Sequence, residues 1–208
     1  MKSIKYLSKI VALAAVAIAC TLPAKAQMSD NAYGNIDWQF NFPLNNGYAD
    51  KGSGWGMNFE GGYYLTDEIS LGGFMAFHSN HEYIPRKTLS LSNGSSFTTD
   101  QQHTLFQLPF GVVARYTFDR SKVFQPYVGV KVGPQYAQLR SDFNAYTATK
   151  NTWGFYASPE VGFNIYPWAY GPGIHMAVYY GYATNSGKIL VYHVDGMSNI
   201  GLRLGIAF

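Results

Sequence analysis

Six charged residues could act on one another inside this protein. Each stands at an alternate position of a segment whose intervening positions are apolar, so all six should share the non-apolar face of their strands. Three are acidic and three are basic. If that face lines a narrow enclosed space, every charge needs a partner, because an unpaired buried charge is costly. The pattern predicts a charge-balanced network made of Asp37, Glu60, Arg115, Lys131, Glu160 and Arg203.

Two pairings within this network follow from the order of the segments. The first and last segments become neighbours when a sheet closes on itself, which should bring Asp37 beside Arg203. Lys131 and Glu160 lie on adjacent segments and form a second expected pair, and His175 is a seventh ionisable residue on the same face. A structural ion-pair network is the favoured interpretation. The alternative is a gate, in which the pairs rearrange to open a water path.

The histidines raise the question of a metal site. His78 and His81 are expected at the end of one segment and His103 at the start of the next, and imidazole is a common metal ligand. Beyond Glu82, however, no carboxylate or cysteine falls into a recognisable ligand spacing. We therefore interpret these histidines as polar residues at the base of a loop, and predict neither a metal nor a cofactor.

Eight alternating segments must position these side chains. One face of them is apolar and carries no charge, while the opposite face holds eleven glycines, which suit the interior of a narrow eight-stranded barrel. A soluble barrel or sandwich would instead expose this glycine-rich face to water. The sequence thus predicts an all-β fold, an eight-stranded antiparallel transmembrane β-barrel in an up-and-down meander, with a bulge at Gly72-Gly73. The segments are 33–44, 54–65, 69–80, 102–118, 123–137, 152–166, 173–183 and 197–208.

The connections between the segments alternate in length. Short ones should face the periplasm together with both chain termini, and long ones should face outward. The short connections are 66–68, 119–122 and 167–172, and the long ones are 45–53, 81–101, 138–151 and 184–196.

The longest connection contains a candidate interaction loop, formed by Asn93, Gly94 and Phe97. Asn-Gly favours a type I′ hairpin turn, so the flanking strands could extend beyond the membrane. A protruding sheet has an edge that can accept a partner strand. The alternative is a flexible loop rich in serine and threonine.

Residues 1–26 have the features of a secretory signal peptide. Lys2, Lys5 and Lys9 precede an apolar run over 10–19, and Ala24-Lys25-Ala26 is an A-x-A cleavage pattern. The alternative is a lipoprotein cleavage box at 17–20. We expect cleavage after Ala26 and a single β-barrel domain over 27–208.

Removal of this leader changes the charge and the cysteine count. It takes four of the 15 basic residues and none of the 12 acidic ones, leaving 11 against 12 and a net charge of −1. The basic balance of the whole chain is therefore no argument for nucleic-acid binding. Cys20 also leaves, so the mature chain should contain no thiol.

Several motifs of the chain resemble those of a known family. They are the A-x-A leader, Gln125-Pro126-Tyr127-Val128-Gly129-Val130, Pro159-Glu160-Val161-Gly162-Phe163 and the terminal Phe208. With the strand pattern, they resemble the small outer-membrane β-barrels grouped with OmpX, OmpW and the membrane domain of OmpA. The resemblance implies residence in outer-membrane lipid of a Gram-negative cell and recognition of Phe208, as an assembly signal, by the barrel-assembly machinery.

The resemblance leaves several functions open. The leading prediction is a non-enzymatic barrel with a plugged lumen, which contributes to the envelope structure or contacts an extracellular or envelope protein through its outer loops. The second is a narrow porin-like channel for small or hydrophobic solutes.

The third function is modification of lipid A. Lipid A deacylases carry His-x-Ser-Asn near the outer leaflet, and Tyr182-Ala183-Thr184-Asn185 is similar in shape and position. Tyr182 stands where the general-base histidine belongs, and a tyrosine is a poor base at neutral pH. Thr184 replaces the serine nucleophile. We therefore predict no catalytic residue.

Overall fold

The computed structural model describes residues 31–44, 47–90, 94, 96–143, 146–168 and 171–208. The expected leader, residues 1–26, and its cleavage site lie outside these residues. No helix among the described residues is long and apolar enough to cross a membrane.

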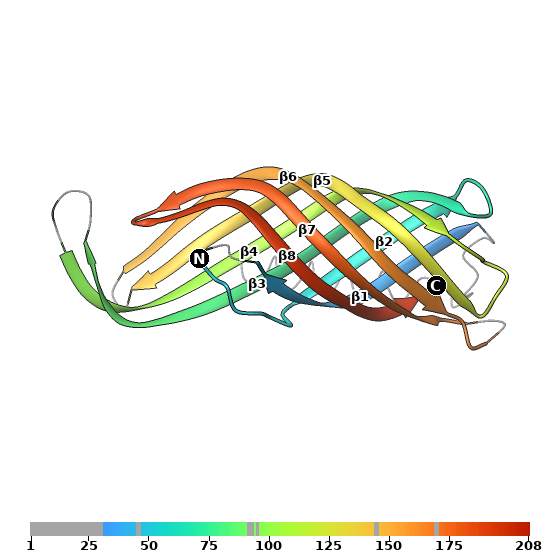
Figure 1. Cartoon of the computed structure of the whole chain (residues 1–208), viewed down its shortest axis with the longest axis horizontal. Helices are drawn as coiled ribbons and strands as arrows, with labels where there is room; N and C mark the ends of the chain where they lie inside the picture. Colours follow the sequence, from blue (N-terminus) through green and yellow to red (C-terminus); the bar gives the residue numbers. More distant parts are fainter. Residues whose placement is uncertain (1–30, 45–46, 91–93, 95, 144–145, 169–170) are drawn as a thin grey trace, which may run out of the picture.

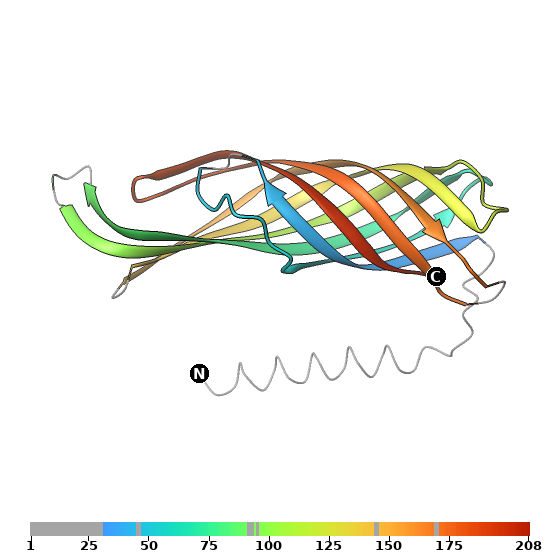
Figure 2. The same ribbon diagram turned by 60° about the horizontal axis from the view of Figure 1, so that its bottom comes forward.

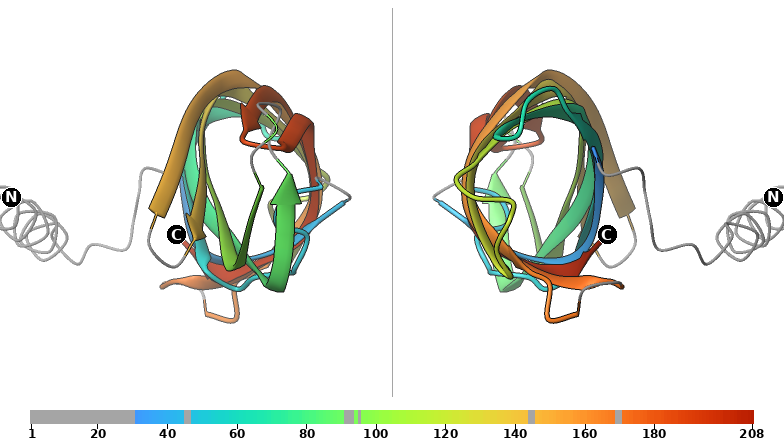
Figure 3. Two further views of the ribbon diagram at one scale, coloured as in Figure 1. Left: turned by 90° about the vertical axis from the view of Figure 1, so that its left-hand side faces the viewer. Right: turned by 90° about the vertical axis from the view of Figure 1, so that its right-hand side faces the viewer.

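Eight antiparallel strands form one closed barrel in which each strand pairs with the next and β8 pairs with β1 (Figures 1 and 3). This confirms the predicted fold class. The strands are β1 (Ala32–Pro43), β2 (Gly56–Tyr64), β3 (Ile69–Ser90), β4 (Ser96–Thr117), β5 (Phe124–Phe143), β6 (Tyr146–Ile165), β7 (Gly173–Ile189) and β8 (Tyr192–Ala207).

The two faces of the barrel wall follow the predicted alternation. In the second half of β8, Ile200, Leu202, Leu204 and Ile206 are exposed, whereas Gly201 and Arg203 between them are buried. The same inversion holds in β1, where Ile36 and Trp38 are exposed and Asp37 is completely buried. Apolar residues outside and polar residues inside are the arrangement expected of a barrel in lipid.

Six strands extend well beyond the predicted segments at one end of the barrel (Figure 1). The two longest, β3 and β4, have 22 residues each. The stretches 138–151 and 184–196, which we expected to be loops, lie largely within the β5–β6 and β7–β8 hairpins. The prediction was wrong here because these stretches are polar, and polar strands outside a membrane lack the apolar alternation that marks a membrane-spanning one.

The predicted bulge at Gly72-Gly73 is also wrong. Both glycines pair regularly, with Val113 and Val112 of β4. The register shifts instead between Ile84 and Lys87 in β3, where Pro85 provides no backbone donor for a regular ladder. A second shift lies between Ala183 and Ser186 in β7.

Candidate functional site

Side chains fill the lumen in three layers along the barrel axis. The end at which the chain terminates has a charge layer, the middle has an amide layer, and the extended end has an apolar layer. Register sets this order, because Asp37, Gln39 and Asn41 follow one another on the inner face of β1. The charge layer consists of Asp37, Glu60, Arg115, Lys131, Glu160, His175 and Arg203, so it contains all six predicted residues.

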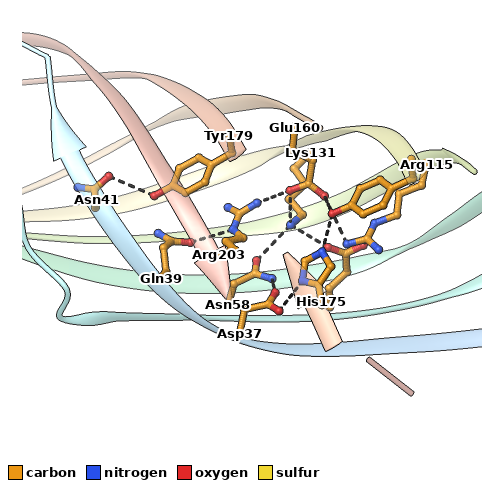
Figure 4. Close-up of polar contacts among 12 residues, drawn as sticks. Asp37, Gln39, Asn41, Asn58, Arg115, Lys131, Glu160, His175, Tyr179 and Arg203 are labelled. Carbon is orange, nitrogen blue, oxygen red and sulfur yellow. Dashed lines mark hydrogen bonds and ion pairs between the residues drawn. The ribbon is translucent and has the colours of Figure 1, made fainter. Parts of the chain in front are cut away.

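A ring of two carboxylates and two cations forms the centre of the charge layer (Figure 4). The Nζ of Lys131 lies 2.7 Å from Oε2 of Glu60 and 2.9 Å from Oε2 of Glu160. Arg115 bridges the same two carboxylates, with Nε 2.5 Å from Oε1 of Glu60 and Nη2 3.4 Å from Oε1 of Glu160. These four side chains are at most 1% exposed. The predicted pair of Lys131 and Glu160 is confirmed as part of this ring.

Arg203 is the third cation of the layer. Its Nη1 contacts Oε2 of Glu160, and its Nε donates to Oε1 of Gln39 at 3.0 Å. Its guanidinium group also lies over the ring of Tyr179, 4.0 Å from the ring centroid. An ion pair, a hydrogen bond and a cation–π contact together compensate the burial of this charge.

Asp37 has partners other than the predicted Arg203. Its Oδ1 lies 2.5 Å from Nδ1 of His175, and its Oδ2 accepts from Nδ2 of Asn58 at 2.8 Å. Register explains the correction, because the residue opposite Arg203 on β1 is Gln39, whereas Asp37 faces Gly205. A shift of two residues along the strand therefore decides which residue pairs with Asp37.

Tyrosine hydroxyls connect the histidine to the carboxylate ring. The hydroxyl of Tyr127 lies 2.7 Å from Nε2 of His175 and 3.2 Å from Oε1 of Glu160. Tyr33 donates to Oε1 of Glu60 at 3.0 Å. The charge layer thus has polar contacts to strands on all sides of the lumen. We did not anticipate these tyrosines, although Tyr33 and Tyr127 occupy the inward phase of their strands.

Neutral hydrogen-bonding side chains make up the amide layer. Nδ2 of Asn41 donates to Oδ1 of Asn80 at 2.7 Å, and Nε2 of Gln135 donates to Oε1 of Gln107 at 3.0 Å. Gln39 connects the amide layer to the charge layer through its contact with Arg203. The amide layer consists of Gln39, Asn41, His78, Asn80, Gln107, Gln135, Asn185 and Asn199. Such contacts give most of these buried polar groups a partner.

The apolar layer fills the lumen at the extended end. It consists of Leu105, Leu139, Ile189, Val194 and Met197, which are at most 5% exposed. The connection between β1 and β2 covers this layer (Figure 2). Tyr48 and Ala49 from this connection, which is otherwise rich in polar residues and glycine, are buried in the same cluster.

Tyr48 is held in the barrel mouth by several contacts. Its ring stacks on His103 at a centroid distance of 4.5 Å, and its hydroxyl lies 2.8 Å from Oγ of Ser141. The backbone oxygen of Tyr48 lies 2.9 Å from Nδ1 of His103. Burial raises the pKa of the Tyr48 hydroxyl to about 12. We refer to residues 47–55 as the cap loop. Sequence reasoning missed it, and its one signal was an apolar Tyr48-Ala49 within a polar connection.

The three histidines considered for a metal site point in different directions. His78 and His103 are buried in the lumen, whereas His81 is on the outer face and its Nδ1 lies 3.1 Å from Oγ1 of Thr104. Among the described residues, no group of three or more His, Cys, Asp or Glu side chains is placed to hold a metal ion.

The residues that resembled a deacylase motif are also dispersed. Tyr182 is exposed on the outer face, and Asn185 is buried in the lumen, where its Nδ2 donates to the oxygen of Thr152. The hydroxyl of Thr184 accepts from the backbone nitrogen of Phe155 at 2.9 Å. These side chains do not converge on one point.

The β3–β4 hairpin extends beyond the rest of the barrel (Figure 1). Gly94 has a φ of 82°, in the region where glycine is favoured in tight turns. Phe97 pairs with Leu89 across the hairpin, while the Phe97 side chain and Asn93 lie outside the described part of the structure.

Strand addition at the β3 edge receives little support from the geometry. Ser79 N donates to the oxygen of Trp55 and Asp50 N donates to Glu82, so the cap loop covers the first part of that edge. Pro85, the register shift and the charges of Arg86 and Lys87 follow, and these features protect an edge from pairing.

Phe208, the predicted assembly signal, is exposed beside the outer face of β8. Its backbone exchanges two hydrogen bonds with Gly34, at 2.8 and 3.2 Å. Trp55 and Trp153 are more than 60% exposed near the start of the extension, as expected for an aromatic girdle. The recognition of Phe208 by assembly machinery stays a prediction.

Comparison with known proteins identifies the family. The family model described as outer membrane protein beta-barrel domain matches residues 12–208. No curated protein matches the chain in sequence.

Several solved outer-membrane proteins are similar in structure. The outer membrane protease OmpT from Escherichia coli has a TM-score of 0.50 at 8% identity, covering 87% of this chain and 97% of its own. The attachment invasion locus protein Ail of Yersinia pestis, in complex with a heparin analogue, has a TM-score of 0.48 at 12% identity, with coverage of 87% and 100%. Outer membrane protein W from E. coli has a TM-score of 0.45 at 18% identity, with coverage of 86% and 96%. At these identities the similarity concerns the fold alone.

Proposed function

This chain belongs to the outer membrane β-barrel domain family, and from that premise we propose that it is a non-enzymatic barrel whose lumen is closed by its own side chains. It acts through the surface of its extended strands, as a structural element of the envelope or a binding surface. Its extended end faces outward, and both termini face the periplasm.

The filled lumen is the observation that carries this proposal. Glu60, Arg115, Lys131, Glu160 and Arg203 are joined into one network and are at most 1% exposed. A continuous water path through this layer would require breaking several charge-assisted contacts at once. Removing one partner of a buried pair costs about 3–5 kcal/mol, so spontaneous opening of the layer is rare.

The charge balance also supports a static plug. Three carboxylates face three permanent cations, with His175 beside Asp37. Each permanent cation contacts at least one carboxylate, which is how a low-dielectric interior tolerates ions.

Conductance in a planar bilayer tests the proposal. The refolded mature protein, verified by a heat-dependent gel shift, should give no discrete current steps. The matched control is the double variant Glu60→Ala with Lys131→Ala, which removes one charge of each sign and empties part of the layer. Steps from this variant beside a silent native protein are the expected result, and native steps that vary with salt would overturn the proposal.

A narrow channel is the second candidate function, and the cap loop favours it. This loop, rather than a strand, closes the wall between β8 and β3 beside the apolar layer, so its release would expose an apolar side entrance. Deleting residues 47–55 separates the two functions. A channel gated by the cap loop would conduct after the deletion, whereas a barrel closed by the charge layer would stay silent.

A further inference from the structure

We propose that the outer face of the extended β3–β6 sheet binds the sugars of glycolipids in the outer leaflet. This inference rests on the proposed orientation, with the extended end outside. We call this face the polar platform. It is formed by the outward side chains of three consecutive cross-strand rows, beginning at Gln138 and Asn151 and ending at Asp142 and Thr147.

The platform continues the lipid-facing surface of the barrel. Tyr136 and Trp153 are paired across β5 and β6 on the outer face, with ring centroids 5.3 Å apart, and form part of the aromatic girdle. Gln138 and Asn151 are the next outward pair on these strands. The platform therefore faces sideways, toward whatever molecules lie beside the barrel above the hydrocarbon.

The height of the platform distinguishes glycolipid from phospholipid. Successive outward rows are about 7 Å apart along a strand, or about 5 Å along the axis of a tilted barrel, so the three rows lie about 5, 10 and 15 Å beyond the girdle. Phospholipid headgroups add about 5–8 Å to each side of the hydrocarbon core. They could reach the first row only. Neighbours for the upper rows must carry a headgroup that is taller, such as an oligosaccharide.

The side chains of the platform are pre-ordered by contacts with one another. Nε2 of Gln138 donates to Oδ1 of Asn151 at 3.1 Å, and Oγ1 of Thr147 donates to Oδ1 of Asp142 at 2.7 Å. The contact uses one amide hydrogen of Gln138 and the side-chain oxygen of Asn151, so it leaves the Gln138 oxygen and both Asn151 amide hydrogens to other partners. Fixed donors and acceptors on the sheet surface suit hydroxyl groups, because little side-chain freedom is lost on binding.

The chemistry of the platform favours sugars over phosphates. Among the outward residues of these three described rows, Arg140 is the one lysine or arginine. Its Nε contacts both carboxylate oxygens of Asp142, at 3.1 and 3.0 Å. A phosphate would have to compete with this carboxylate. The remaining positions are mainly neutral amides and hydroxyls, and the exposed ring of Tyr83 adds an apolar surface for a sugar ring.

Native mass spectrometry of the mature protein in phosphatidylcholine nanodiscs tests this assignment. The probes are rough lipopolysaccharide with its core sugars, lipid A and phosphatidylglycerol. The double variant Gln102→Ala with Thr147→Ala removes an amide and a hydroxyl of the third row, where both residues pair in register with Asp142. It should retain about three- to tenfold less rough lipopolysaccharide, as expected for losing one or two exposed hydrogen bonds. Retention of lipid A and phosphatidylglycerol should stay unchanged.

The matched control removes an exposed amide at the other end of the barrel. Asn31→Ala should retain all three probes like the native protein, since the Asn31 side chain lies at the opposite end of the barrel, where it donates to the hydroxyl of Tyr63. If the platform variant retains as much rough lipopolysaccharide as the native protein, the proposal is overturned. A loss that is equal for all three probes would also overturn it, because that result would indicate phosphate binding.

Two further outcomes identify the source of the ligand. Free core oligosaccharide without lipid chains should compete only weakly, and competition as strong as that of the glycolipid would overturn the membrane assignment. A conducting native barrel would overturn the proposed plug and leave the platform result standing. The heat-dependent gel shift of each variant shows that it is folded.

Discussion

Asp37 and His175 are in contact although their strands, β1 and β7, do not adjoin. Oδ1 of Asp37 lies 2.5 Å from Nδ1 of His175. Both residues pair in register with Gly205 of the intervening β8. Because glycine has no side chain, the two groups meet across it. This contact holds the closing strand pair from the inside and connects it to the rest of the charge layer.

The buried cations should contribute far more to stability than an exposed pair of similar geometry. Arg203→Ala leaves Glu160 short of a partner and should lower the free energy of unfolding by about 3–5 kcal/mol. Lys122→Ala removes an exposed pair with Asp119 at 2.8 Å and should leave the free energy of unfolding nearly unchanged, because solvent screens such pairs. Urea unfolding in detergent micelles measures both, and an unchanged midpoint for Arg203→Ala would count against the network.

Gly62 should tolerate a side chain only when Tyr33 gives way. A Cβ at position 62 would lie 2.6 Å from the ring of Tyr33, which pairs with Gly62 in register. Gly62→Ala should therefore destabilise the barrel by about 1–3 kcal/mol through overpacking. Adding Tyr33→Ala removes the clash. Tyr33→Ala should therefore lower the free energy of unfolding less in the Gly62→Ala variant than in the native protein. Additive losses in urea unfolding would contradict this explanation.

The cap loop should be released only at strongly alkaline pH. Burial raises the pKa of Tyr48 to about 12 from the ordinary 10.0, so the docked loop favours the protonated hydroxyl. This contribution to docking is fully present below pH 10 and is lost as the pH rises toward 12. The difference in tyrosinate absorbance between the native protein and Tyr48→Phe should titrate near pH 12. A difference centred on 10 would show that Tyr48 is not buried.

The proposed orientation can be tested in intact cells with single cysteines. Cys20 is the one cysteine of the sequence and lies in the expected leader, so the mature protein provides a thiol-free background. Ser96→Cys at the extended end should react with a membrane-impermeant maleimide in intact cells. Lys122→Cys in the opposite turn should react only after the outer membrane is permeabilised. The reverse labelling pattern would contradict the orientation.

Local alternation along the chain was sufficient to identify the strands and their faces. A residue's phase within a strand depends only on its immediate neighbours, since side chains alternate with a period of two. For this reason the eight strands, the apolar exterior and the burial of Asp37, Glu60, Arg115, Lys131, Glu160 and Arg203 could be predicted from the sequence. The outer halves of the hairpins could not, because their polar residues carry no such pattern.

The tertiary structure decided which of these residues meet. Pairing within the lumen depends on the register between strands distant in sequence, and a shift of two residues directs Arg203 to Gln39 and Asp37 to His175. The cap loop is also non-local, because Tyr48 packs against His103 and Ser141 from two other strands. The sequence by itself determined what faces the lumen, and the closed barrel determined its contacts, because register and loop packing are properties of the assembled sheet.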